Sequence, residues 1–534
     1  MKFISSKPIK IMGIRPPEAD VTLQDYEEIS KEISVTPRRT RVPSLSLFYV
    51  GTLLDQELHQ LGYKTETSFY DLAASQPDTL SDYSEEFAQF SEVKYGSGKI
   101  YKRLRGKPIS ELVDIVRDSD ICFMSSLFTA GASAVAQTIK AVKESNPKAL
   151  VILGGRDAQY RPQWYLQQGA DVVFLGQAET LAGRVVDALV KNKSISFPGI
   201  ATKTNSGSLT NSSERISRNA NLENEVLPNF DPRILRLYTE SCDGTLPNSI
   251  SRPVMWYSTS VGCPESCDFC PTAGSHYFSL SAERVNRIFE HYKKAGIHTL
   301  LSAEDNFLAR LRDPRRKKGE AEQEITEIMQ LMRQYGFSHE FSNGLEVSLL
   351  NDGKGNIRER LISELFARNG AIGTYRMYWP IETFVDRNHF RKLAGKEAHL
   401  RILDSVLQTG IPEIIFNTII FIDYGPKEIE SLRKEIGEFC DWMTKHQRQT
   451  KWSLPIFHEL PLPGSKSYGR LLPRSFDINI HPELWAVPIN PVNGLHYSYD
   501  ELYSIKRKLM EEFDPKGLAS WDDLGRYSAT SHKE

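Results

Sequence analysis

The chain has 534 residues, of which 40% are hydrophobic and 25% charged, and its formal net charge is −2. These values are ordinary for a globular protein of about two to four domains, and the charge balance does not point to nucleic acid or to an anionic membrane as a partner. The sequence contains no apolar run of about 18 residues, so no transmembrane helix is predicted and we expect a cytoplasmic protein with neither a membrane nor a nucleic-acid partner.

The first part of the chain alternates strands and helices. Strand-like runs are predicted at residues 9–14, 64–72, 121–125, 150–153 and 171–175, with helices at 51–61 and 133–145. Residues 18–42 are polar and are predicted to form an irregular insertion. The alternation predicts βαβ units and a parallel sheet, and the number of strands fits a flavodoxin-like order of 2-1-3-4-5. Such a sheet binds ligands beyond the carboxyl ends of its strands.

A polar segment rich in Ser, Asn and Thr follows, and we expect a linker over residues 200–245. A second alternating series has strand-like runs at 253–259, 299–303, 340–347, 374–381, 414–422 and 452–459. These β-then-α repeats predict a partial (β/α)6 barrel with functional groups at the C-terminal mouth of the strands. The predicted α/β domains are residues 1–199 and 246–470, and residues 471–534 form a C-terminal extension.

Three of the six cysteines, Cys263, Cys267 and Cys270, form a CxxxCxxC motif directly after a predicted strand. Three closely spaced thiolates can bind three irons of a [4Fe–4S] cluster, and the fourth iron is then left without a protein ligand. A zinc site with His276 as the fourth ligand is one alternative, although structural zinc sites usually pair two CxxC-type elements. A ferredoxin-like electron carrier is another, but it would need a fourth cysteine close by.

With Phe269 before its last cysteine, this motif resembles the signature of the radical S-adenosylmethionine (SAM) superfamily. The resemblance implies that the open iron binds SAM and that an electron from the cluster cleaves it. The segment LSAEDNF at residues 301–307 resembles the strand-2 motif that receives the SAM amino group, although it departs from the common Gly-Gly-Glu form. The SAM-binding residues implied at the strand ends are Glu304, Asp305, Ser342, Glu382 and Asn417.

Residues 7–190 are similar to the cobalamin-binding domain found upstream of many radical SAM proteins, through segments such as SSLFTAGA, VILGGRDA and FLGQAETL. Small residues in these segments would let the backbone approach a flat corrin ring. Glycines in the tight βα turns of any doubly wound domain would give the same pattern. The cobalamin-binding residues implied by the resemblance are Ser125, Ser126, Thr129, Gly154, Gly155, Gly176, Gln177 and Glu179.

Together the resemblances imply an enzyme with three cofactors: a [4Fe–4S] cluster, SAM and cobalamin. The leading hypothesis is methylation of an unactivated carbon of a small molecule or natural-product intermediate, with an electron donor such as flavodoxin or ferredoxin. Cyclisation, ring contraction, dehydration or epimerisation without methyl transfer is the second reading, and a non-catalytic iron–sulfur protein is the third. The strand segment from Tyr375 to Trp379 fits either a substrate or corrin contact or aromatic core packing.

Overall fold

In a computed structural model, the chain folds into two compact units. The first comprises Met1–Asp243 and Asp477–Ala486, and the second comprises Gly244–Phe476 and Val487–Glu534. The structure describes residues 7–24, 42–74, 91–95, 98–203, 209–211, 223, 226–239, 253–317, 319–352, 354–381, 395–486 and 489–514.

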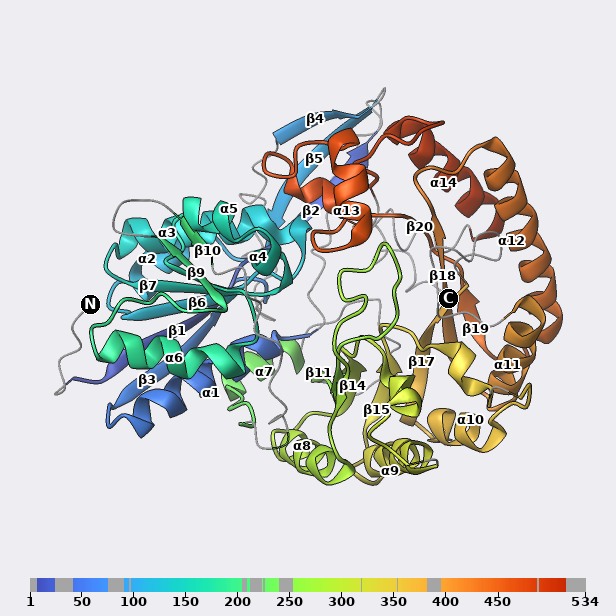
Figure 1. The fold of residues 1–534 in the computed structure, drawn as a ribbon, viewed down its shortest axis with the longest axis horizontal. Coiled ribbons are helices and arrows are strands. Elements are labelled where there is room, and N and C mark those ends of the chain that lie inside the picture. Colours follow the sequence, from blue (N-terminus) through green and yellow to red (C-terminus); the bar gives the residue numbers. More distant parts are fainter. Residues whose placement is uncertain are drawn as a thin grey trace. The chain divides into compact units, whose positions relative to one another are not determined.

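The first unit is built on a parallel sheet with strand order β3-β1-β6-β7-β8 (Figure 1). Its strands are β1 (Ile9–Arg15), β3 (Thr65–Asp71), β6 (Ile121–Ser125), β7 (Leu150–Gly154) and β8 (Val172–Phe174). In chain order this arrangement is 2-1-3-4-5, so the predicted flavodoxin-like topology is confirmed. The carboxyl ends of these strands therefore lie along one edge, as expected for a ligand-binding sheet of this class.

Helices cover both faces of this sheet (Figure 1). One face carries α1 (Leu45–Gln60) and α6 (Ala178–Val190), and the other carries α3 (Ala132–Ser145) and α5 (Pro162–Gln167). Two apolar layers result, one on each side of the sheet, because alternate strand side chains point to opposite faces. The prediction for α1 was six residues short at its N-terminus, where Leu47 and Phe48 continue the buried stripe.

The expected linker is wrong in part, because the structure folds three of its segments into the first unit. The strands β9 (Ile200–Lys203) and β10 (Leu209–Asn211) extend the sheet antiparallel beyond β8. Helix α7 (Pro232–Thr239) also belongs to this unit, and its Tyr238 hydroxyl donates to Asp71 Oδ2 at 2.7 Å. These elements are too short for their apolar residues to form a recognisable period.

The polar insertion predicted at residues 18–42 contains a strand, β2 (Glu18–Gln24). It pairs antiparallel with β5 (Gly98–Arg105), which in turn pairs with β4 (Ser91–Tyr95), in a separate three-stranded sheet. Its pairing partners are distant in the sequence, so the polar composition of residues 18–24 gave no local indication of a strand.

The second unit is a parallel sheet whose strands follow one another in chain order. They are β11 (Val254–Tyr257), β14 (Thr299–Ser302), β15 (Ser338–Phe341), β17 (Ile372–Pro380), β18 (Glu413–Ile420), and then β19 (Lys451–Ser453) and β20 (Ile456–His458), which both pair with β18. This is the topology of an open β/α barrel, so the predicted partial barrel is confirmed. The sixth predicted strand is split into β19 and β20.

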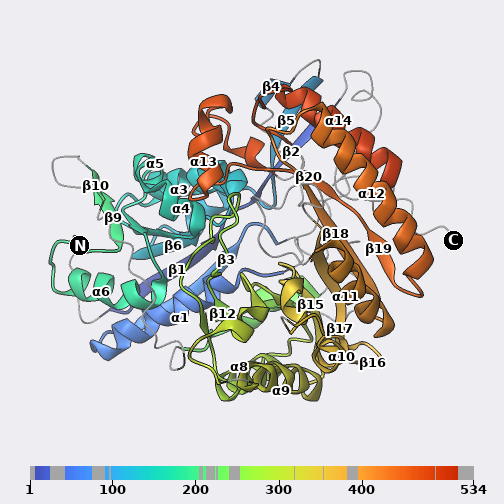
Figure 2. The same ribbon diagram turned by 45° about the vertical axis from the view of Figure 1, so that its right-hand side comes forward.

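Helices lie along the outer face of this sheet (Figure 2). They are α8 (Ala282–Lys294), α9 (Glu320–Gln334), α10 (Glu359–Phe366), α11 (Lys396–Gln408) and α12 (Pro426–His446). The predicted start of α8 is confirmed, since the Ser281 side chain accepts a hydrogen bond from Arg284 N. Such a cap satisfies one of the unpaired backbone donors at a helix N-terminus.

The expected C-terminal extension divides between the units. Helix α13 (Lys466–Leu471) and helix α14 (Tyr499–Phe513) belong to the second unit, where α14 packs on α12 and β20. Between them, Asp477–Ala486 belongs to the first unit, and Arg161 Nη1 donates to Ile478 O at 3.3 Å. A buried 3-10 turn, Pro482–Trp485, anchors this segment. The extension is therefore a structural part of both units.

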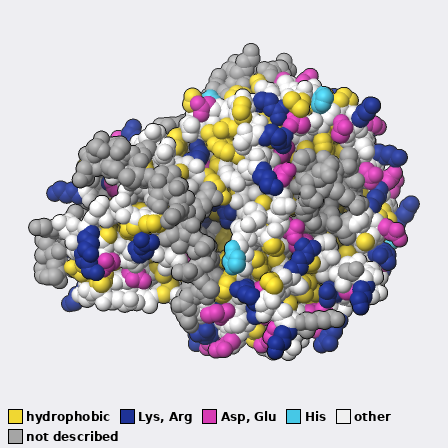
Figure 3. Space-filling model, viewed as in Figure 1, with side chains coloured by type: hydrophobic (Ala, Val, Ile, Leu, Met, Phe, Trp, Pro, Cys, Tyr) yellow, Lys and Arg dark blue, Asp and Glu magenta, His cyan; other side chains and the backbone are white. Residues whose placement is uncertain are grey.

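On the face drawn in Figure 3, basic and acidic side chains are interspersed. This agrees with the net charge of −2. Among the described residues, no helix is both long and apolar enough to cross a membrane.

Candidate active site

The three clustered cysteines lie in a loop closed by a short hairpin. Strand β12 (Ser260–Val261) precedes the loop and pairs antiparallel with β13 (Phe278–Ser279), which follows it. Cys263 and Cys267 are buried, whereas Cys270 is half-buried. A turn brings Cys270 N to 3.2 Å from Cys267 O. The loop follows the first strand of the barrel, as the sequence predicts.

Contacts from other strand ends fix this loop. Gly262 has φ +81°, and a Cβ there would overlap the carbonyl oxygen of His276, so the position requires glycine. The Gly262 N–H donates to Asp305 Oδ2 at 3.0 Å. At the other side of the loop, Ser467 N donates to Asp268 O at 3.0 Å. Residues following β14 and β20 therefore hold the backbone that carries the cysteines.

Glu304 is buried and its carboxylate is fully used within the protein. Oε1 accepts from Thr259 N at 2.9 Å and from Thr259 Oγ1 at 2.6 Å. Oε2 accepts from the Ser260 hydroxyl and lies 3.5 Å from Arg310 Nη1. A carboxylate offers about four acceptor sites, so none remains for a ligand. The predicted role of Glu304 in SAM binding is therefore not supported, and Asp305 is the better candidate.

A further network, which the sequence did not reveal, connects the buried Asn306 and Glu346 to a cysteine sulfur. Asn306 Nδ2 lies 3.7 Å from Cys263 Sγ and donates to Glu346 Oε2 at 2.7 Å. Glu346 Oε1 pairs with Arg312 Nη2 at 2.8 Å, and Arg312 also pairs with Glu265 in the cysteine loop. Asn306 lies within the quoted LSAEDNF segment, but its partners are distant in the sequence, so only the fold shows its role.

The other residues predicted to bind SAM have different environments. Ser342 follows the end of β15, and its hydroxyl donates to Glu340 Oε1 at 2.9 Å. Asn417 lies in β18, and its Oδ1 atom is buried without a hydrogen-bond partner among the described residues. A buried acceptor of this kind is costly unless a ligand or water completes it, so Asn417 fits a ligand-binding role. Glu382 lies outside the described residues.

Most side chains of the aromatic strand segment in β17 are buried inside the second unit. Trp379 is fully buried and donates its indole N–H to His399 on α11. The Tyr375 hydroxyl donates to Glu340 Oε2 at 2.7 Å, and Arg376 Nη1 lies 3.3 Å from the same oxygen. For Trp379, core packing is therefore the correct alternative.

No three Cys, His, Asp or Glu side chains among the described residues converge on a site for a single metal ion. In a [4Fe–4S] cluster, each thiolate binds a different iron, so three ligands need not meet at one point. Three thiolates on one loop can bind three irons of such a cluster, which leaves the fourth iron without a protein ligand.

At the carboxyl edge of the first sheet, two adjacent glycines differ in the space around them. Gly154 ends β7, and a Cβ there would meet no atom within 4 Å. Gly155 has φ +97°, and a Cβ there would overlap the backbone oxygen of Ser126. Gly155 is therefore required by the fold, whereas Gly154 leaves open space. Ser125, at the end of β6, is half-buried.

Two of the predicted cobalamin contacts have their side chains turned into the protein. Thr129 Oγ1 donates to Asp157 Oδ1 at 2.6 Å, and Ser126 Oγ lies 2.6 Å from the Tyr165 hydroxyl. Asp157 also pairs with Arg161 at 2.6 Å. Because Ser126 and Thr129 are both 2% exposed, their hydroxyls stabilise the βα turns. Contact of these hydroxyls with a corrin is not supported.

The remaining predicted positions lie near the start of α6. Gly176 O accepts from Gln159 Nε2 at 3.3 Å, and Gln177 Oε1 is buried without a partner among the described residues. Glu179 is half-buried in the first turn of α6. Leu127 and Phe128, after β6, are 54% and 68% exposed. Open space at one glycine, an unsatisfied amide oxygen and exposed apolar side chains fit a large, mainly flat ligand at this edge.

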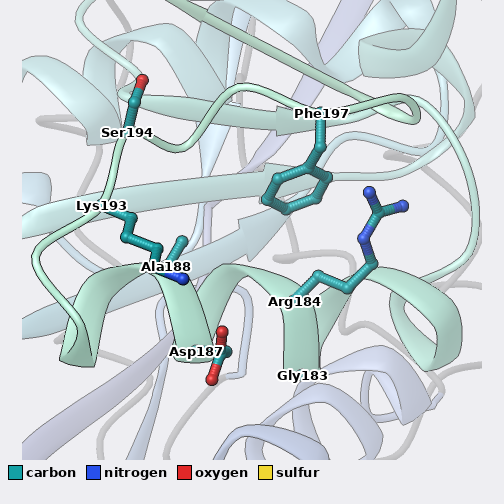
Figure 4. Close-up of a pocket in the computed structure, with 7 residues that line it drawn as sticks. All are labelled: Gly183, Arg184, Asp187, Ala188, Lys193, Ser194 and Phe197. Atoms are coloured by element: carbon teal, nitrogen blue, oxygen red, sulfur yellow. The ribbon is translucent and has the colours of Figure 1, made fainter.

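A surface pocket of about 360 Å³ lies elsewhere in this unit (Figure 4). It is lined by residues of α6 and the following segment: Gly183, Arg184, Asp187, Ala188, Lys193, Ser194 and Phe197. The Arg184 guanidinium lies 4.2 Å from the centre of the Phe197 ring. The pocket includes none of the predicted site residues, so we assign it no cofactor.

Comparisons with known proteins concern the family of one segment and the fold of the chain. Residues 103–186 match the family described as "B12 binding domain". No protein of curated function matches the sequence. Among solved structures, the chain resembles apo OxsB, a cobalamin-dependent SAM radical enzyme, with a TM-score of 0.62 and 13% identity over 95% of this chain and 67% of OxsB.

Two further structures are similar. OxsB with aqua-cobalamin bound gives a TM-score of 0.53 and 13% identity over 95% of this chain and 56% of that chain. The radical SAM methyltransferase TsrM from Kitasatospora setae, with cobalamin and a [4Fe-4S] cluster bound, gives 0.53 and 11% identity over 86% of this chain and 74% of TsrM. The chain thus spans little more than half of one OxsB chain. Its fold is similar to that of OxsB and TsrM, and residues 103–186 match the B12 binding domain family.

Proposed function

We propose that this protein is a cobalamin-dependent radical SAM methyltransferase that methylates an unactivated carbon of a small molecule. The observation that carries the proposal is the CxxxCxxC loop, which strand-end contacts hold in place, in a chain whose residues 103–186 match the B12 binding domain family. TsrM, which has a similar fold, is a methyltransferase, and OxsB is a cobalamin-dependent SAM radical enzyme. Both support the assignment of the cofactors.

When bound, the cluster supplies the electron that cleaves SAM, and cobalamin carries the methyl group. Cys263, Cys267 and Cys270 hold the cluster in this proposal. Asp305 receives the SAM amino group, because a carboxylate beside the cysteine loop can accept its N–H bonds. Asn417 Oδ1 offers a second buried acceptor for SAM.

Glu304 and Arg310 have a supporting role in the proposal. Both side chains are fully buried, and both contact Thr259, directly after the first barrel strand. They keep the start of the cysteine hairpin in place when the cofactors bind. Precise positioning matters because a radical must be formed close to its target and away from water.

In the first unit, the proposed corrin site is the carboxyl edge of the sheet. The space at Gly154 would accommodate the ring, and Gln177 Oε1 could accept a hydrogen bond from a polar group of the cofactor. The exposed Leu127 and Phe128 side chains would be available to contact its apolar surface. The remaining partners in the proposal are a small-molecule substrate and a flavodoxin or ferredoxin as electron donor.

The decisive experiment is anaerobic reconstitution of the full chain with iron, sulfide and cobalamin, followed by incubation with SAM and a reductant. Formation of 5′-deoxyadenosine supports radical cleavage, and transfer of a labelled methyl group from SAM to a product supports the methyltransferase assignment. Deoxyadenosine with no labelled product from the physiological substrate would instead favour cyclisation or another radical reaction. A protein that binds the cluster but never cleaves SAM would contradict the enzyme assignment.

A further inference from the structure

The environment of the cysteine sulfurs contains two polar side chains whose role goes beyond holding the loop. Asn306 is 1% exposed, and its Nδ2 atom lies 3.7 Å from Cys263 Sγ. Thr272 Oγ1 lies 3.1 Å from Cys270 Sγ. A thiolate bound to iron can only accept a hydrogen bond. In a loaded site, both contacts are therefore N–H···S or O–H···S bonds directed at the cluster ligands.

The orientation of the Asn306 amide is set by Glu346. An amide can be reversed in a structure without changing its shape, so its donors are identified from its neighbours. Glu346 is 0% exposed, and its Oε2 atom lies 2.7 Å from Asn306 Nδ2, which must be the NH₂ group because a carboxylate cannot donate. The second hydrogen of the same NH₂ group is then available to Cys263.

Glu346 is itself held in place. Its Oε1 atom pairs with Arg312 Nη2 at 2.8 Å and accepts from the Ser348 hydroxyl at 3.1 Å. Arg312 pairs in turn with Glu265 between the first two cysteines. The contacts form a closed path from the cysteine loop through Arg312, Glu346 and Asn306 back to Cys263. The buried part of this path, Glu346 and Asn306, directs the amide N–H towards Cys263.

We propose that Asn306 and Thr272 are positioning residues that raise the reduction potential of the cluster through these two hydrogen bonds. The inference rests on the proposed function, since it requires the [4Fe–4S] cluster. One electron from an external reductant converts the 2+ cluster to the 1+ cluster, and no bond forms or breaks. The added negative charge falls partly on the sulfurs, so donors to sulfur stabilise the reduced form more than the oxidised form.

The test is a redox titration of the reconstituted full-length protein, followed by the electron paramagnetic resonance signal of the reduced cluster, without SAM. Thr272→Val keeps the shape of the side chain and removes the hydroxyl. Asn306→Leu removes the buried amide at similar size. Asn343→Leu is the matched control, because Asn343 Nδ2 donates to Glu304 O at 3.0 Å rather than to a cysteine.

We expect a more negative midpoint potential in Thr272→Val and in Asn306→Leu than in the parent protein, a larger shift in the double variant, and the parent potential in Asn343→Leu. Unchanged potentials in the single variants would overturn the inference. If Asn306→Leu does not assemble the cluster, Thr272→Val alone decides the outcome. A parent protein that never shows the iron–sulfur absorption or the reduced signal would contradict the proposed function instead, so the two failures are distinguishable.

Discussion

The two units differ in the side chains that they place at the carboxyl ends of their strands. In the first unit, this edge has open space at Gly154, exposed apolar side chains at Leu127 and Phe128, and hydroxyls turned inward. In the second unit, buried carboxylates join separate segments near the strand ends. Glu304 accepts a hydrogen bond from Thr259, and Glu346 pairs with Arg312. The first edge is suited to receive a large ligand by shape, and the second is suited to hold one loop rigid.

The largest expected effect comes from removing one cysteine of the loop. Cys267→Ala should abolish cluster assembly and SAM cleavage, while cobalamin still binds to the first unit. Iron and sulfide analysis and the cobalamin absorption spectrum of the same sample measure both sites. Cys440→Ala is the control, because burial raises the pKa of Cys440 to about 12 and keeps it a thiol, whereas iron binds thiolates. Retention of a full iron complement by Cys267→Ala would contradict the assignment.

The adjacent carboxylates Glu304 and Asp305 should respond differently to loss of charge. Glu304→Gln disrupts a fully buried ion pair with Arg310 and should lower the free energy of unfolding by about 3 kcal/mol. Asp305→Asn should leave stability nearly unchanged but weaken SAM binding roughly tenfold, because a charge-assisted hydrogen bond is lost. Denaturant titration and calorimetric SAM titration of the reconstituted protein measure the two effects. Normal SAM affinity in Asp305→Asn would disprove its proposed role.

Substitutions of Gly154 and Gly155 in the first unit should likewise separate an effect on cobalamin binding from an effect on stability. Gly155→Ala forces a left-handed conformation on alanine and a clash with Ser126 O, so we expect a loss of roughly 1–3 kcal/mol in stability. Gly154→Ala adds a methyl group to open space and should leave stability unchanged while weakening cobalamin binding. Thermal unfolding and cobalamin absorption titrations measure these outcomes. Equal cobalamin affinity in Gly154→Ala and the parent would place the corrin elsewhere.

Acid should destabilise the second unit through its buried histidines. Burial lowers the pKa of His339, His399 and His458 to about 3, below the ordinary value of 6.5. The unfolded chain therefore binds more protons than the folded one between pH 6.5 and pH 3, and stability falls as the pH falls through this window. The expected loss is about 2 kcal/mol for each histidine at pH 5. By contrast, His59 in the first unit has a 54% exposed side chain.

Guanidine denaturation at pH 7 and pH 5 checks this prediction, with His399→Gln as the test variant. Glutamine can still accept the Trp379 indole N–H, so this variant should retain the fold and show a smaller pH dependence. If the free energy of unfolding falls by the same amount from pH 7 to pH 5 in His399→Gln as in the parent protein, His399 does not contribute to the loss of stability in acid.

The fold was predictable where the apolar pattern is local. The flavodoxin-like order and the barrel strands follow from buried runs such as residues 121–125 and 299–303, whose period needs no distant partner. Strands β9 and β10 were missed because they are short edge strands, stabilised by pairing with a sheet already formed. The split of the sixth barrel strand was missed for a similar reason, because β19 and β20 are defined by their pairing with different parts of β18.

For the candidate sites, the motif predicted the cysteines but not what surrounds them. Spacing alone identifies Cys263, Cys267 and Cys270 as a group, whereas the distinction between Glu304 and Asp305 depends on which carboxylate meets Thr259 and Arg310 in space. Asn306 and Glu346 are 40 residues apart, so no local pattern could connect them.

The assignment of Asp477–Ala486 to the first unit has a consequence for biosynthesis. A ribosome completes the sheet of this unit long before it makes Pro482–Trp485, a buried turn that packs against α3 and the 3-10 turn Thr129–Gly131 of the same unit. At typical elongation rates, the delay after residue 243 is roughly ten to fifty seconds. During that interval the nascent first unit lacks part of its packing, so a gene truncated after the barrel would yield an incomplete N-terminal unit even though its N-terminal sequence is intact.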